Sequence, residues 1–152
     1  MILILNILPI DPGITDVVKA YRFLKNRVRH TPTEYSFPLS EICGAPVYIK
    51  WENQQLCGSF KLRGALYKMN SLTPEERAKG VVTCSSGNHG QGVALAAKEL
   101  GIRTQIFVPN VCPETKKSAI KRRGGEYVEL VVTSGDYDFA EHSAHEQADR
   151  TG

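Results

Sequence analysis

The chain has 152 residues, of which 41% are hydrophobic and 23% charged, and its formal net charge at pH 7 is +3. This composition is typical of a soluble globular protein and leaves room for one ordinary domain or two small ones. The charge is mild and the basic runs are short, which argues against a nucleic-acid partner; the cluster at 121–123 is interpreted as a solvated helix end. Four widely spaced cysteines without a C-x-x-C pair argue against a zinc site or a disulfide framework and favour reduced thiols in the cytoplasm.

The first ten residues, MILILNILPI, are apolar but too few to cross a bilayer. They lack the positively charged flank and the small-residue cleavage site of a signal peptide. We therefore expect no membrane association. Residues 1–12 are predicted to form an N-terminal extension, either a buried strand or an accessory segment.

The stretch from 13 to 72 is predicted to hold a helix, a strand and a second helix. Apolar residues at helical spacing predict the first helix, which should end at the Thr31-Pro32 step because a residue before proline disfavours helical geometry. The segment PVYIKWE (46–52) is predicted to be a strand, and the next helix should begin at Ser59, a good N-cap residue. The apolar residues of the first helix are Val17, Tyr21, Leu24 and Val28.

From Thr73 onward the pattern becomes regular. Thr73, Pro74 and Glu76 have the spacing of a capping box and predict a short helix that stops at Gly80. Three strands then alternate with three helices, which indicates βαβ units and a parallel sheet of the α/β class. The strands are predicted at 81–84, 104–109 and 127–132, the helices at 91–100, 113–123 and 137–149, and a loop at 85–90.

The loop SSGNHG (85–90) joins the first of these strands to the helix that follows. In open parallel sheets, ligands bind beyond the carboxyl ends of the strands, and amides at a helix start suit a carboxylate or a phosphate. Glycines allow close approach by the backbone, and the other residues add hydroxyl, amide and imidazole groups. The loop is therefore predicted to bind a ligand, with a plain polar turn as the alternative. Its glycines are Gly87 and Gly90, and its polar residues are Ser85, Ser86, Asn88 and His89.

Two common nucleotide motifs do not match this loop. The glycines at 87, 90 and 92 give G-x-x-G-x-G instead of G-x-G-x-x-G, and Pro109-Asn110 stands where the dinucleotide fingerprint places an acidic residue. The chain also has no G-x-x-x-x-G-K-[ST] run. Nicotinamide-cofactor binding and hydrolysis of nucleoside triphosphates are both disfavoured.

Lys61 lies in the segment CGSFKLRGA (57–65), within the first turn of a predicted helix. Most lysines are solvated surface charges, but the positive end of the helix dipole disfavours an ammonium at this place. If Lys61 is buried beside Phe60, its amine loses the proton more readily, and Schiff-base chemistry needs an unprotonated amine. These arguments make Lys61 a candidate nucleophile.

The pair GSFKLRGA (58–65) and SSGNHGQG (85–92) resembles the fold-type II pyridoxal-phosphate enzymes, and among them the threonine dehydratase and serine racemase branch. Leu-Arg-Gly after the lysine and His-Gly after the loop asparagine distinguish the chain from the cysteine and threonine synthases. The resemblance implies the tryptophan synthase β-like fold, of which the chain would supply the N-terminal half. It runs from about Asp16 through Gly152 and includes HTP (30–32), YIKWEN (48–53) and GIRTQIFVP (101–109).

The resemblance implies a role for each matched site residue. Lys61 would form a Schiff base with pyridoxal 5'-phosphate, Phe60 would lie against the cofactor ring, and Asn88 would hydrogen-bond the ring hydroxyl oxygen. Ser86 matches the serine that is the second acid/base in racemases of this branch, and dehydratases carry it too. The loop that receives the substrate carboxylate would consist of Ser85, Ser86, Gly87, Asn88, His89 and Gly90.

The implied reaction is the dehydration of L-threonine or L-serine to a 2-oxo acid and ammonia, with an amino acid as the small-molecule partner. A serine/threonine racemase and a truncated, non-catalytic binding module stay as alternatives, and a homo-oligomer stays open. Residues 13–72 would belong to a large cofactor domain and residues 73–152 to a small domain for the substrate carboxylate. The glycine-rich phosphate loop of the family does not occur in this sequence, which suggests a fragment or a naturally shortened protein.

Overall fold

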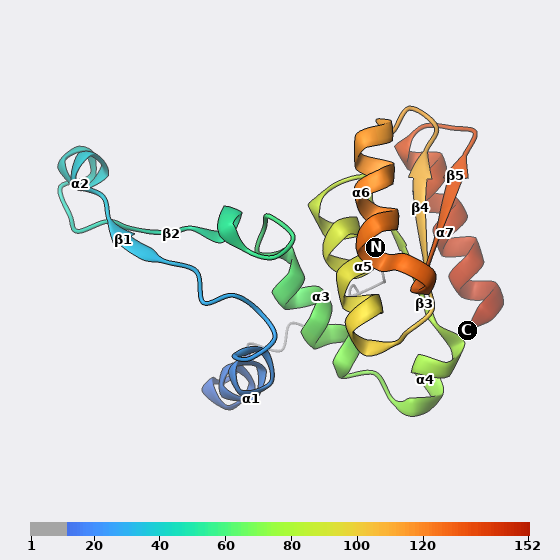
Figure 1. The fold of residues 1–152 in the computed structure, drawn as a ribbon, viewed down its shortest axis with the longest axis horizontal. Coiled ribbons are helices and arrows are strands. Elements are labelled where there is room, and N and C mark those ends of the chain that lie inside the picture. Colours follow the sequence, from blue (N-terminus) through green and yellow to red (C-terminus); the bar gives the residue numbers. More distant parts are fainter. Residues whose placement is uncertain (1–11) are drawn as a thin grey trace.

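Three parallel strands form the centre of the body of the molecule, and their order is β3-β4-β5 (Figure 1). The structure is a computed structural model that describes residues 12–152, so the predicted extension at 1–12 lies almost wholly outside the described residues. The strands are β3 (Val81–Cys84), β4 (Thr104–Pro109) and β5 (Val128–Thr133). The predicted α/β class with a parallel βαβ sheet is confirmed, and the carboxyl ends of all three strands meet at one edge.

Helices cover both faces of this sheet. α5 (Asn88–Leu100) and α6 (Glu114–Gly124) lie on one face, and α7 (Tyr137–Thr151) lies on the other (Figure 1). Alternate residues of the central strand β4 pack against the helices on opposite faces of the sheet, because successive side chains of a strand point to opposite faces. Ile106 and Val108 join the core under α5 and α6, whereas Phe107 joins a second core with Ala140 and Ala144 of α7.

α3 (Lys61–Asn70) extends the first core, because it packs along α5 in the most extensive helix–helix contact of residues 12–152. Its buried face consists of Leu62, Leu66 and Met69, each 1% exposed. Full burial of one such side chain contributes about 1.5–3 kcal/mol relative to its exposure. α3 therefore lies firmly on the body, even though the predicted domain boundary at 72/73 separates it from α5.

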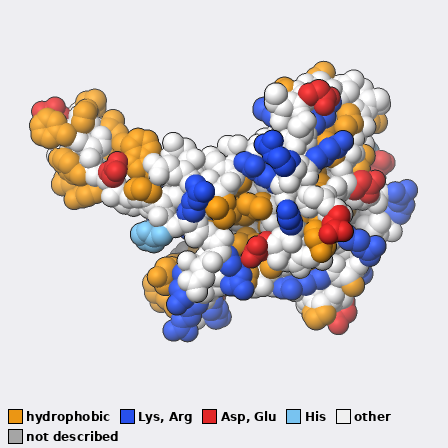
Figure 2. Space-filling model, viewed as in Figure 1, with side chains coloured by type: hydrophobic (Ala, Val, Ile, Leu, Met, Phe, Trp, Pro, Cys, Tyr) orange, Lys and Arg blue, Asp and Glu red, His pale blue; other side chains and the backbone are white. Residues whose placement is uncertain are grey.

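The N-terminal part of the described chain projects from the body as an arm (Figure 1). The arm contains β1 (Thr33–Tyr35), α2 (Phe37–Cys43) and β2 (Tyr48–Lys50), and the two strands pair antiparallel. α1 (Ile14–Leu24) lies beside the root of the arm and contacts α3. Hydrophobic side chains cover much of the arm in Figure 2, and several are more than half exposed: Tyr35, Phe37, Ile42 and Tyr48.

Two predicted helix starts were wrong. α3 begins at Lys61 instead of Ser59, because Ser59 is buried in the preceding turn, where its carbonyl accepts a hydrogen bond from the Cys57 thiol at 3.4 Å. α5 begins three residues early, so Asn88, His89 and Gly90 form its first turn instead of a loop. The cause is local, since the amide of Gln91 already donates to the Gly87 carbonyl at 3.2 Å.

Other bounds also differ, and four elements were not predicted. α1 ends at Leu24, well before the predicted Thr31-Pro32 step, after which turns lead to a segment without regular secondary structure at 29–32. The strand predicted at 46–52 is limited to β2. A 3-10 helix, η2 (Glu52–Gln54), follows β2, and another, η3 (Gly125–Tyr127), precedes β5. The capping box of α4 (Pro74–Lys79) is confirmed in both hydrogen bonds. β1 and α2 had no sequence signal strong enough to predict them.

Every helix within residues 12–152 is too short or too polar to cross a bilayer. Cys43 is exposed, Cys57, Cys84 and Cys112 are buried, and all four are free thiols. The basic cluster at 121–123 lies in the last turn of α6, where positive charge interacts favourably with the carboxyl end of the helix dipole.

Candidate functional site

The loop after β3 lies at the carboxyl edge of the sheet. The amide of Ser85 donates to the Phe107 carbonyl at 3.1 Å, which extends the β3–β4 ladder by one residue. The Ser85 hydroxyl then accepts a hydrogen bond from the Gly87 amide at 3.3 Å. Ser85 is buried, while Ser86 and Gly87 are half-buried. The loop is thus anchored at Ser85 and opens toward the surface at Ser86.

Gly90 allows this loop to fold back on the first turn of α5. A Cβ atom at Gly90 would collide with the Ser85 carbonyl oxygen and would stand 3.3 Å from Cδ1 of Ile120. Only a residue without a side chain therefore fits between the loop and α6. The close approach of the Ser85 backbone explains this glycine without any unusual dihedral angle.

The start of α5 has no side-chain cap, and Gly87 is its N-cap residue. The first amides of a helix have no acceptor within the helix, and they carry the positive end of its dipole. Asn88 is exposed and His89 is half-buried at this end. The arrangement suits a small anion such as a carboxylate, since amides and dipole both favour negative charge there.

Lys61 is the first residue of α3 and its side chain is exposed. The predicted condition of burial is therefore not met within the described residues, because α3 turns Leu62 toward the core and leaves Lys61 at the surface. The Lys61 Nζ stands 5.1 Å from the centroid of the Phe60 ring, which is itself 58% exposed. An accessible primary amine thus lies beside an accessible aromatic ring.

The two motifs meet where α3 crosses the start of α5. A Cβ atom at Gly92 would stand 3.1 Å from both the carbonyl carbon of Lys61 and the amide nitrogen of Leu62, so the glycine lets the two helices approach. Burial lowers the pKa of His89, and the positive charge of Lys61 lowers it further. The fold therefore brings Lys61 near the loop at 85–90, although 24 positions separate Lys61 from Ser85 in the chain.

One cluster near Lys61 was not predicted. Arg63 donates from Nε to Glu52 Oε2 at 2.9 Å and from Nη2 to Glu52 Oε1 at 2.8 Å. The Arg63 guanidinium holds the pKa of Glu52 at about 2, and the Thr31 hydroxyl, which donates to Glu52 at 2.5 Å, adds to this effect. Both charged residues stand within segments already noted, but no spacing in the sequence indicates that they pair.

A cavity of about 750 Å³ lies at the opposite, amino-terminal end of the strands. It is lined by residues such as Lys79, Arg103 and Gly152 and contains none of the predicted site residues. Ligands of open parallel sheets bind at the carboxyl edge. The surface around Lys61 and the 85–90 loop is therefore the stronger candidate site.

Comparison with known proteins identifies the family of the chain. Residues 24–152 match the model of a family described as pyridoxal-phosphate dependent enzyme. The chain belongs to this family. A biosynthetic L-threonine dehydratase of Corynebacterium glutamicum is 44% identical over 137 residues, which cover 90% of this chain and 31% of that protein. This chain thus spans about a third of the length of that relative.

Solved structures show the same fold. A processed threonine deaminase of Solanum lycopersicum aligns with a TM-score of 0.76 at 36% identity, covering 92% of this chain and 42% of its own. A serine racemase of Dictyostelium discoideum aligns with a TM-score of 0.78 at 34% identity, covering 90% and 43%. The predicted membership of the fold-type II enzymes, with their dependence on pyridoxal phosphate, is confirmed.

The described residues fit one side of this cofactor. Pyridoxal phosphate carries an aldehyde, which reacts with an amine, and a flat ring, which packs against an apolar surface. Lys61 and Phe60 offer these groups side by side, and Asn88 adds an exposed amide. The family holds the cofactor phosphate with a glycine-rich loop, but the longest run of glycines in this sequence is Gly124-Gly125.

Proposed function

We propose that this chain forms the lysine-bearing part of a threonine dehydratase, an ammonia-lyase that converts L-threonine, and L-serine as a second substrate, to a 2-oxo acid and ammonia. The observation that carries the proposal is the contact of the α3 start with the α5 start at Gly92. This contact puts an accessible amine near an uncapped helix end, as an amino-acid substrate requires. The identity to threonine dehydratases supports the choice of reaction.

In this proposal Lys61 has two tasks. Its amine would hold the cofactor covalently, and its Nζ would accept the proton from the substrate Cα. Pyridoxal phosphate, when bound, supplies an electron sink that lowers the barrier to removing this proton. The β-hydroxyl would leave as water with the proton that Nζ took from Cα, and a water molecule would then hydrolyse the released enamine to the 2-oxo acid and ammonia.

The other residues orient the reacting groups. The loop from Ser85 to Gly90 receives the substrate carboxylate, with the first amides of α5 as donors. Phe60 would pack against the cofactor ring and Asn88 would donate to its hydroxyl oxygen. Residues 13–72 belong to the cofactor domain and residues 73–152 to the carboxylate domain in this proposal, with α3 as the element that joins the two through its packing on α5.

A racemase is the second candidate. Ser86 is half-buried in the loop, and in a racemase its hydroxyl would exchange a proton with the substrate face opposite Lys61. The similarity to a serine racemase at 34% identity supports racemisation as the second candidate reaction. The two reactions share Lys61 and differ in the fate of the β-hydroxyl, so product analysis separates them.

The test is to incubate the chain with pyridoxal phosphate, reduce it with borohydride and map the labelled peptides. We expect the label on Lys61, its loss in Lys61→Ala and its retention in Lys98→Ala, a matched change of an exposed helical lysine. Label spread over surface lysines and undiminished in Lys61→Ala would exclude this role of Lys61. With L-threonine or L-serine added, a 2-oxo acid indicates the dehydratase, a D-amino acid the racemase, and no turnover a non-catalytic module.

A further inference from the structure

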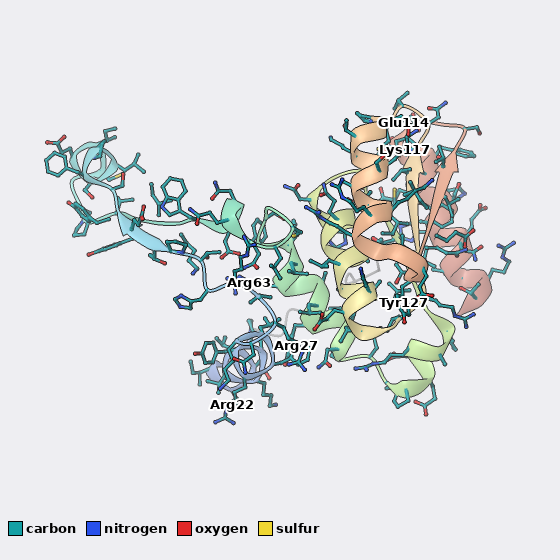
Figure 3. The ribbon with its side chains drawn as sticks, viewed as in Figure 1. Arg22, Arg27, Arg63, Glu114, Lys117 and Tyr127 are labelled. Atoms are coloured by element: carbon teal, nitrogen blue, oxygen red, sulfur yellow. The ribbon has the colours of Figure 1, made fainter. Side chains whose placement is uncertain are left out.

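Arg63 lies where the arm joins the body, in the first turn of α3 (Figure 3). Its guanidinium makes the two hydrogen bonds to Glu52 described above and a third, from Nη2 to the Arg29 carbonyl at 3.2 Å. The side chains are 31% exposed for Arg63 and 17% for Glu52. A bidentate pair of this kind fixes the orientation of both side chains as well as their distance.

Glu52 is in turn held by a network at the root of the arm. The Lys50 ammonium donates to the Thr31 carbonyl at 2.7 Å, and Thr31 donates to Glu52. The Gln55 side chain accepts from the Arg29 amide and donates to the Arg29 carbonyl, both at 2.9 Å. Within residues 12–152, Arg63 supplies the only side-chain hydrogen bonds from α3 to this network.

The start of α3 needs such support for two reasons. Its N-cap position is occupied by Phe60, which provides no capping hydrogen bond, so the first turn is prone to fray. Arg63 and Lys61 also put positive charge at the positive end of the helix dipole, and the Glu52 carboxylate offsets this cost. Gly92 supports the same turn from the α5 side.

We infer that the Glu52–Arg63 ion pair positions Lys61. It holds the first turn of α3 from the arm side while α5 holds it from the other, so that the Lys61 amine is presented at one place beside the 85–90 loop. Arg63 acts through the helix backbone and is a positioning residue. The inference rests on the proposed function, because it gives the pair its purpose in holding the cofactor lysine.

The experiment uses the full chain and measures two quantities in each variant. The first is amide hydrogen exchange in a peptide covering 57–64 without cofactor, and the second is the share of borohydride-fixed pyridoxal label on Lys61. Arg63→Gln should speed the exchange by about tenfold and reduce the Lys61 share of label severalfold. Arg63→Lys keeps the charge without the bidentate geometry and should recover part of both. Arg77→Gln, which removes hydrogen bonds at the far end of α3, is the matched control and should leave both near wild type.

Each outcome decides between two claims. If Arg63→Gln is folded by circular dichroism and labels Lys61 as selectively as wild type, the positioning role is wrong while the proposed function stands. If wild type itself is not labelled at Lys61, the proposed function is wrong, and so is the inference that the Glu52–Arg63 pair positions a cofactor lysine. Should Arg63→Gln fail to fold, Glu52→Gln carries the same test, because it keeps the side-chain shape and removes the charge.

Discussion

Replacement of Gly90 by alanine tests the packing that shapes the candidate site. The added Cβ would collide with the Ser85 carbonyl oxygen, a backbone atom held by the β3–β4 ladder, and would press on Ile120. Overpacking costs about 1–3 kcal/mol, and the upper part of this range, about 2–3 kcal/mol, applies here because the clashing atom belongs to the backbone and cannot turn away. Alanine in place of glycine within a helix stabilises by about 1 kcal/mol. We expect Gly90→Ala to lower the free energy of unfolding by about 1–2 kcal/mol.

Gly64→Ala provides the matched control. Gly64 also lies in the first half of a helix, is exposed, and has nothing within 4 Å of an added Cβ. The same substitution there should stabilise the chain by up to about 1 kcal/mol. The two variants should therefore differ by about 1–3 kcal/mol, or about 2–12 °C in melting temperature for a chain of this size. Urea and thermal unfolding followed by circular dichroism measure both.

A single result would refute this reasoning. If Gly90→Ala melts at or above wild type while Gly64→Ala is stabilised as expected, the loop and the start of α5 do not approach as the structure has them. The candidate site would then need a different geometry, because Ser85 to Gly90 owe their arrangement to that approach.

Three further predictions test local interactions. Thr73→Ala should destabilise the chain by about 1 kcal/mol through loss of the α4 capping box. Thr115→Ala, at an exposed position of α6, should leave the stability unchanged. Urea unfolding measures both variants. Because the folded-state pKa of Glu52 is about 2 against an ordinary 4.5, its ion pair stabilises the fold above about pH 4.5 and loses this contribution as the pH falls toward 2. Glu52→Gln should therefore be less stable than wild type at pH 7, and the difference should shrink in urea titrations from pH 5 to pH 2; a constant difference argues against the pair. The pKa of His89 is lowered by burial and by the charge of Lys61, so it should rise in Lys61→Ala. An NMR titration of the imidazole measures this pKa, and no rise would mean that Lys61 does not lie close to His89.

The fold class was predictable because the signals that carry it are local. Strands 81–84 and 104–109 were located to the residue, since their apolar runs are bounded by glycines or a proline and stand between helices with clear periodicity. The capping box of α4 was likewise confirmed, because it needs only residues three apart. Two elements of the arm, β1 and α2, escaped prediction for the converse reason: β1 has three residues, too few for a period to show, and α2 has only seven. β2 lies within the strand predicted at 46–52 but is also only three residues long.

Long-range relations account for the remaining differences. The start of α3 was predicted at Ser59 from its N-cap propensity, but burial of Ser59 beside Cys57 moved it to Lys61. The candidacy of Lys61 as a nucleophile was conditional on its burial, but the core takes Leu62 instead and leaves the lysine exposed. Propensity describes one segment at a time, whereas burial depends on what the rest of the fold places against it.

The sequence by itself determined the order of the elements, the parallel sheet, the two motifs and, through their resemblance, the family to which the chain belongs. Only the tertiary structure decided that the start of α3 meets the start of α5 at Gly92, and that Arg63 pairs with Glu52. The reason is physical. A motif consists of neighbouring residues and can be recognised in the sequence, whereas a contact between distant segments forms only when a common core fixes their distance. The candidate site depends on that second kind of information.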